Sequence, residues 1–140
     1  MPNIALRRPA KLKSVHGSHR PDLSNNGHKD NRVAHCSAAK PSTDSFWRVD
    51  LLQPYLVQSV YFLTSKNWGH FNPFEIRVGN NELDGGKHNP LCSGNLTLSK
   101  GKSEIFECGN KFGRYVSVHL YPPEIKHTSF CEVQVHGMVV

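Results

Sequence analysis

The sequence has no apolar run long enough to cross a membrane, and its 140 residues suffice for about one domain. It also lacks a Cys-x-x-Cys pair, a nucleophile elbow, a phosphate-binding glycine loop and a zinc-protease helix. The nine histidines are dispersed. Glu75, Glu104 and Glu107 alternate with apolar residues, as solvent-facing carboxylates on strands do. We therefore expect one domain, residues 1–140, that is not an enzyme.

Acidic residues are scarce, because eleven Asp and Glu stand against seventeen Lys and Arg, which gives a formal net charge of +6. The excess of cations is concentrated in the first twenty residues. A basic surface attracts anions such as acidic lipid, sulfated glycans or nucleic acid. This basic segment lacks the interleaved aromatic residues on which nucleic-acid bases stack. Nucleic acid is therefore not the expected partner, and a solvated segment is the simpler interpretation.

Only four cysteines are present, at positions 36, 92, 108 and 131, and an even number permits three disulfide pairings among which the residues alone do not choose. Asn95-Leu96-Thr97 is an N-glycosylation triplet. Both features favour a secreted, extracellular protein. The first residues lack the apolar core of a signal peptide. An extracellular location therefore requires a leader that has been removed, and the alternative is an intracellular chain with free thiols.

Short strands separated by Gly, Asn and Pro turns are predicted from Phe46 onward, whereas the first forty-odd residues have a loop-like composition. In residues 115–120 the apolar side chains share one face, and Ser117 and His119 share the other. No long helix is predicted. The pattern is typical of an antiparallel β-sandwich or barrel. The predicted strands are residues 46–52, 57–64, 74–78, 104–107, 115–120 and 131–136.

Four segments in order resemble the F-type lectin, or fucolectin, family: NIALRRPA (3–10), FWRVDLL (46–52), GRYVSV (113–118) and CEVQV (131–135). Single segments of this kind also occur in the wider discoidin-like superfamily. The resemblance implies an all-β fold, an eight-stranded antiparallel β-sandwich of the jelly-roll type. It further implies the disulfides Cys36–Cys131 and Cys92–Cys108, a carbohydrate-binding function with glycans as partners, and a tendency of such lectins to form homo-oligomers.

The fucose-binding pattern of the family is incomplete here. F-type lectins hold fucose with a His and two basic residues on adjacent loops, and this sequence has Ala38 at the His position and Ser65 where an Arg-x-Asp motif begins. One hypothesis is that the site is rebuilt from the loop after residue 64. Cationic, imidazole and amide groups there would bond sugar hydroxyls, and an indole would cover the apolar face of the ring. The candidate residues are Lys66, Trp68, His70 and Asn72.

The resemblance also implies a structural calcium ion, held by early-loop oxygens and by the Glu after the last cysteine. The matching positions are Asn25, Asp30, Cys131 and Glu132. His28 and His35 appear where the family has an Asp and a Ser. Calcium takes six to eight oxygen ligands and imidazole suits it poorly. We therefore expect a calcium site that is weakened, lost or adapted to another metal.

A second class of function remains open. With sugar binding lost, a discoidin-like module would bind anionic lipid, a sulfated polyanion or a protein through its loop tips. Trp68 and Phe71 beside Lys66 would supply apolar groups flanked by charge. In that case Trp68 need not contact a sugar. Polyanion binding weakens steeply as salt rises, whereas binding of a neutral sugar does not.

Overall fold

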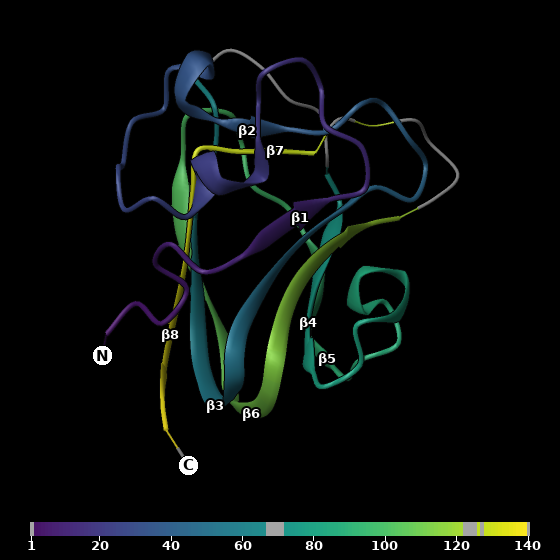
Figure 1. Ribbon diagram of the computed structural model, residues 1–140. Helices are drawn as coiled ribbons and strands as arrows, with labels where there is room; N and C mark the ends of the chain where they lie inside the picture. The colour runs from purple at the N-terminus through teal and green to yellow at the C-terminus, as the bar shows by residue number, and fades with distance from the viewer. Residues whose placement is uncertain (1, 67–71, 122–125, 127, 140) are drawn as a thin grey trace.

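The computed structural model describes the whole chain except residues 1, 67–71, 122–125, 127 and 140 (Figure 1). The described residues form eight strands and three short 3₁₀ helices, and every strand pairing is antiparallel, which confirms the predicted fold class. The strands are β1 (Ala10–Leu12), β2 (Ser37–Ala38), β3 (Phe46–Leu63), β4 (Phe74–Gly79), β5 (Leu91–Leu96), β6 (Ser103–Leu120), β7 (Ser129–Phe130) and β8 (Glu132–Met138). The 3₁₀ helices are η1 (Pro21–Ser24), η2 (Val33–His35) and η3 (Leu83–Gly86).

Two long strands, β3 and β6, form the centre of the sandwich (Figure 1). The first part of β3 lies between β1 and β6, with Ala10 opposite Val49. Its last part lies between β8 and β6, with Leu63 opposite Glu132. The sheet continues from β6 to β4 and β5, and β2 pairs with β7 in a separate ribbon. The part of the sandwich that contains β1 and the part that contains β8 therefore share β3 and β6.

The boundaries of these strands differ from the prediction in one consistent way. Residues 46–52 and 57–64 were expected as two strands, as were 104–107 and 115–120, yet each pair is one continuous strand. In β3, Leu52 has a φ of 72° and the register shifts between Asp50 and Tyr55. Such irregularities bend a strand without ending it. The turn-forming residues in the sequence therefore indicated a bend within one strand, and not the end of one strand and the start of another.

The N-terminal third is more ordered than its composition indicated. Loops were expected before residue 46, but β1 pairs with β3, and β2 pairs with β7. These strands have only three and two residues, which is too short for a period to be visible in the sequence. The predicted disulfides Cys36–Cys131 and Cys92–Cys108 are both formed. In the chain-entropy account, the longer cross-link stabilises the fold by about 4–5 kcal/mol and the shorter by about 3 kcal/mol.

The core is built on aromatic residues from distant strands. The rings of Phe62 and Phe130 lie 4.9 Å apart between centroids, and Phe74 meets Phe62 edge-on at 5.7 Å. Trp47 is fully buried, and its Nε1 donates a hydrogen bond to the carbonyl oxygen of Pro21 at 3.1 Å. Each such side chain contributes about 1.5–3 kcal/mol by burial. The Trp47 contact also fixes η1 against the sandwich.

The outer face of β6 is covered and not solvated. Ser117 and His119 face away from the apolar core as predicted, but both are buried because the segment containing η3 lies over them. Glu75 was expected to be solvated, and this was wrong. It is 8% exposed and accepts a 2.9 Å hydrogen bond from Arg77. Glu104 and Glu107 are exposed as expected.

Candidate functional site

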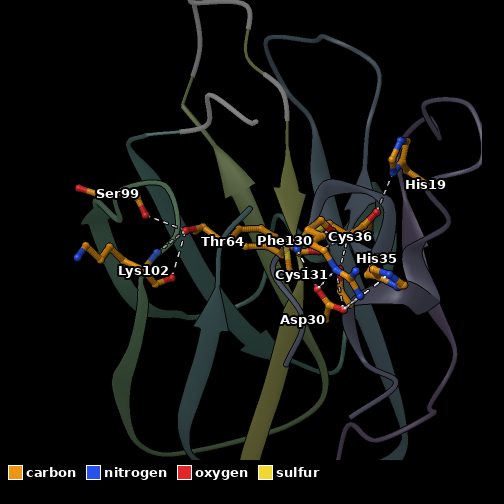
Figure 2. Close-up of a disulfide and its surroundings, with 12 residues drawn as sticks. His19, Asp30, His35, Cys36, Thr64, Ser99, Lys102, Phe130 and Cys131 are labelled. Atoms are coloured by element: carbon orange, nitrogen blue, oxygen red, sulfur yellow. Dashed lines mark hydrogen bonds and ion pairs between the residues drawn. A yellow bond between two sulfur atoms is a disulfide. The ribbon is translucent and has the colours of Figure 1, made fainter. Parts of the chain in front are cut away.

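The loop that leaves β3 is braced by the loop that precedes β6. The Thr64 hydroxyl donates to the Ser99 carbonyl oxygen at 2.7 Å and accepts from the Lys102 main-chain N–H at 3.1 Å, as Figure 2 shows. The Gly101 N–H donates to the Ser65 carbonyl oxygen at 2.9 Å. These contacts fix the chain at the point where the candidate sugar-binding loop begins.

Lys66 combines a fixed main chain with an exposed side chain. Its N–H donates to the carbonyl oxygen of Asn31 at 3.0 Å, so the early loop holds it from one side and the Gly101 loop lies against it from the other. The Lys66 side chain is exposed. An ammonium carries three N–H donors. Lys66 is therefore placed to offer a cation and several donors to a ligand at this end of the sandwich.

Asn72 braces the far end of the same loop. Its Nδ2 donates to the carbonyl oxygen of Leu98 and its Oδ1 accepts from the N–H of Leu98, both at 3.0 Å. One N–H and one lone pair of the amide have no partner among the residues that the structure describes. The sugar contact of Asn72 thus stays a prediction beside a structural role that the sequence did not indicate. Trp68 and His70 lie outside the described residues.

The two positions that depart from the family pattern are buried. Ala38 is fully buried on β2, opposite Ser129 of β7. Ser65 is also fully buried, and its hydroxyl has no hydrogen-bond partner among the described residues. Neither side chain reaches the surface, so neither can contact a sugar in place of the family's His or Arg. Any sugar contact at this end must therefore come from neighbouring positions.

Lys126 is a charged residue that the sequence analysis missed. It is 2% exposed, and its Nζ donates to the carbonyl oxygen of Tyr121 at 3.1 Å. Two main-chain hydrogen bonds, 3.0 and 3.1 Å long, join Lys126 to Ser42. A buried lysine has no local signature, so no sequence pattern could have identified it. Lys126 therefore joins the loop before β3 to the loop before β7.

Asn25 and Asp30, two of the predicted calcium-binding residues, both have protein partners, but the Oδ1 of Asn25 has none among the described residues. Asn25 is fully buried and donates from Nδ2 to the carbonyl oxygens of Ala5 and Arg8, at 2.9 and 2.8 Å. Arg32 binds Asp30 through two guanidinium nitrogens, the closer at 2.7 Å (Figure 2). This hydrogen-bonded pair holds the pKa of Asp30 well below its usual range. The Asp30 carboxylate therefore already has a cation.

Glu132 is the remaining acidic candidate, since the sulfur of Cys131 is in a disulfide. Glu132 is fully buried, and Gln134 donates to its Oε2 at 3.1 Å. Burial raises the pKa of Glu132 to about 7, against a smaller lowering by Gln134 and the positive charge of Lys29. The Lys29 ammonium lies 4.6 Å from the ring centroid of Tyr61, the β3 residue opposite Gln134. Lys29 therefore lies near enough for its charge to act on the Glu132 carboxylate, without forming an ion pair with it.

The fit of these residues to calcium is incomplete. Calcium requires several anionic or carbonyl oxygens converging on one point. The Asp30 carboxylate is bound by Arg32, whereas two buried oxygens, Oδ1 of Asn25 and Oε1 of Glu132, have no hydrogen-bond partner among the described residues. The described residues contain no group of three His, Cys, Asp or Glu side chains that could hold a metal ion. A calcium ion at these residues therefore stays a prediction.

The sheet order, with the loops after β3 and before β6 side by side, is that of a galactose-binding-like β-sandwich. Residues 23–118 match the family model described as NedA-like, galactose-binding domain. Fucolectin-4 of the eel Anguilla japonica is 34% identical over 149 residues, which cover 98% of this chain and 80% of the relative. The chain therefore belongs to the fucolectin, or F-type lectin, family. Because its relatives are lectins, the expectation that it is not an enzyme is confirmed.

Solved structures agree with this assignment. The fucolectin from the serum of striped bass, Morone saxatilis, superposes with a TM-score of 0.93 at 32% identity and covers 99% of this chain. The present chain spans about half of that bass chain, 48%. A Streptococcus pneumoniae fucose binding module has a TM-score of 0.80 at 22% identity, over 95% of this chain and 93% of its own. At that identity the second likeness supports the fold alone.

Proposed function

We propose that this chain is a lectin module that binds fucose or a related sugar through the loop end around Lys66. The observation that carries the proposal is the exposed Lys66 side chain on a main chain fixed from two sides by Asn31 and the Gly101 loop. Membership in the fucolectin family supports the ligand class. A fixed main chain loses no freedom on binding, so only the ordering of the Lys66 side chain opposes affinity for a small polar ligand.

The chemistry assigns each candidate residue a separate task. The Lys66 ammonium would donate to sugar hydroxyls or to the ring oxygen, and His70 would add a further polar contact. Trp68 would cover the apolar C–H face of the sugar. Asn72 would use the N–H and the lone pair that Leu98 leaves. With Ala38 and Ser65 buried, fewer strong donors are present than in the family pattern.

A weak sugar site binds a multivalent ligand more tightly when several copies of the site are linked. Linking several weak sites raises the apparent affinity through effective concentration. We propose that the chain acts as a multivalent lectin, either as a homo-oligomer or as one of several modules. The bass relative is about twice as long as this chain, and this length agrees with the second arrangement.

We propose an extracellular location. The bass relative comes from serum, and the two disulfides suit an oxidising compartment. No helix in the described part of the chain combines the length and apolar character needed to span a membrane.

A second candidate function is charge-driven binding of a sulfated polyanion or an anionic lipid surface. The observation in its favour is that Lys66, Lys100 and Lys102 are all exposed on the two loops at this end. Such binding would weaken steeply between low and moderate salt. Binding of a neutral fucoside would be almost unaffected by the same change.

The test is a glycan array at low and high salt with the wild-type chain, Lys66→Gln and a matched control, Lys111→Gln, whose lysine is exposed on β6. The proposal predicts salt-resistant binding to fucosylated glycans that falls about tenfold or more in Lys66→Gln and is unchanged in Lys111→Gln. Binding restricted to sulfated glycans at low salt would support the second candidate. Absence of any fucoside binding would overturn the first.

A further inference from the structure

A groove on the side of the sandwich, distinct from the loop end, lies next to the segment containing η3. This segment is the teal coil beside β4 in Figure 1. It covers the outer face of β6, where Phe46 and Glu75 flank His119 on the neighbouring strands. The Phe46 ring lies 5.9 Å from the ring of His119 between centroids. Phe46 is half-buried, so part of its ring remains accessible.

The main chain of η3 is held in an unusual conformation against this face. Asp84, Gly85 and Gly86 have φ values of 52°, 68° and 90°. A Cβ on Gly85 would overlap the ring of Phe46, so only glycine allows this close approach. Asp84 and Phe46 consequently line the same hollows. Conformations of this kind often lie at ligand sites.

Two adjoining hollows of about 340 and 540 Å³ open along this segment. Lys13, Phe46 and Asp84 line both of them, so the hollows form one groove. Volumes in this range suit small-molecule sites. The lining combines an aromatic surface with ammonium donors and carboxylate acceptors. A sugar ring needs both kinds of hydrogen-bonding partner and an apolar wall.

The charges in the groove favour a ligand that bears a single negative group. Within the groove Lys13 pairs with Asp44, His88 with Asp84 at 2.8 Å, and Arg48 with Glu82 at 3.7 Å. Lys11 and Lys87 line the two hollows and have no carboxylate partner among the described residues. Both lysines are exposed.

Cations also act on the interior of the groove. Burial, together with the positive charges of Arg77, Lys87 and His88, lowers the pKa of His119 to about 4. The carboxylates of Asp44 and Asp84 would repel the closely spaced charges of a polyanion. A monoanionic sugar avoids this repulsion because its hydroxyls donate to the carboxylates while its acidic group faces the lysines.

We propose that this groove is a second binding site, which takes an acidic sugar residue whose ring lies on Phe46 and whose sulfate or carboxylate faces the unpaired lysines, Lys87 in the first hollow and Lys11 in the second. The site is independent of the fucoside site proposed at Lys66. A glycan carrying both a neutral and an acidic sugar would then be recognised at two faces of the domain.

The test is calorimetric titration with galactose 6-sulfate, 3′-sialyllactose, lactose and inorganic sulfate. The proteins are the wild-type chain, the double variant Lys11→Gln/Lys87→Gln, Lys66→Gln and the control Lys111→Gln. We expect the double variant to bind the acidic sugars at least tenfold more weakly, with Lys66→Gln and Lys111→Gln unchanged. NMR shift changes on adding galactose 6-sulfate should include the Phe46 and Lys87 amides. A preference for one acidic probe would distinguish sulfate from carboxylate as the group recognised.

Three outcomes would overturn the proposal. The first is no binding of either acidic sugar by the wild-type chain. The second is unchanged binding in the double variant, or an equal loss in Lys66→Gln, because both would place the anion elsewhere. The third is inorganic sulfate binding as tightly as the sulfated sugar, because the ring would then contribute nothing. Fucoside binding is measured separately, so failure of the loop-end site leaves this test intact.

Discussion

Arg114 binds Asp50 through two parallel hydrogen bonds, from Nε to Oδ1 at 2.7 Å and from one terminal nitrogen to Oδ2 at 2.9 Å. These residues belong to the two segments, FWRVDLL and GRYVSV, on which the family resemblance rested. Asp50 also accepts the Leu52 N–H at 2.8 Å, where β3 bends. The two motifs are therefore one structural unit that joins β3 to β6 at the bend.

Substitution of Asp50 should destabilise the fold at neutral pH, and the loss should diminish in acid. The pKa of Asp50 is lowered chiefly by its hydrogen bond to Arg114, so the stabilisation is present above the unfolded pKa of about 3.8 and is lost as pH falls through the folded pKa. Asp50→Asn should lower Tm by a few degrees at pH 7. Below pH 3 the difference from wild type should shrink. A difference that stays constant from pH 7 to pH 2.5, measured by thermal unfolding, would contradict this role.

Glu132 should make the fold less stable as pH rises toward 8. Its pKa is raised from 4.5 to about 7, so the folded state holds more protons than the unfolded state within that window. Stability therefore falls as pH rises through it, by on the order of 2 kcal/mol. Glu132→Gln keeps an acceptor for Gln134 and removes the charge. Urea unfolding at pH 5 and pH 8 should show that the free energy of unfolding of the variant rises relative to wild type at pH 8 only. An equal difference in free energy at both pH values would refute the raised pKa.

Calcium should have no effect on stability. Asp30 is bound by Arg32, so the predicted residues offer calcium one carboxylate without a basic partner, that of Glu132, on which the Lys29 charge also acts. Millimolar calcium or a chelator should leave Tm unchanged, since only a ligand that binds the folded state raises it. The control is a calcium-dependent protein measured in the same buffers. A rise of Tm with calcium that disappears in Glu132→Gln would restore a metal site at these residues.

Gly85→Ala should be more destabilising than Gly17→Ala, although both glycines have positive φ, 68° and 56°. At Gly17 nothing lies within 4 Å of an added Cβ, so only backbone strain of about 1 kcal/mol is expected. At Gly85 the methyl group would overlap Phe46, which adds a further 1–3 kcal/mol or so. Chemical denaturation compares the two directly. Equal losses would mean that η3 moves freely away from Phe46.

The sequence was sufficient for the fold class, because alternation of apolar and polar residues reports which side of a strand faces the core. Val116 and Val118 are buried as their spacing predicted. The cysteine pairing followed from the family resemblance and not from the residues themselves, since four cysteines permit three arrangements. Both disulfides formed as that resemblance implied.

Only the tertiary structure determined which segments cover the polar face of each strand. Glu75 and His119 have the alternation of solvent-facing residues, yet both are buried, His119 beneath the segment containing η3 and Glu75 in contact with Arg77. The two amide atoms of Asn72 are engaged by Leu98, 26 residues away, and no local pattern reveals this. Sequence periodicity describes a residue's own strand, whereas burial and hydrogen bonding depend on segments that arrive from elsewhere in the chain. The sequence by itself therefore determined a β-sandwich of this family, and the packing of distant loops determined which side chains remain free to bind.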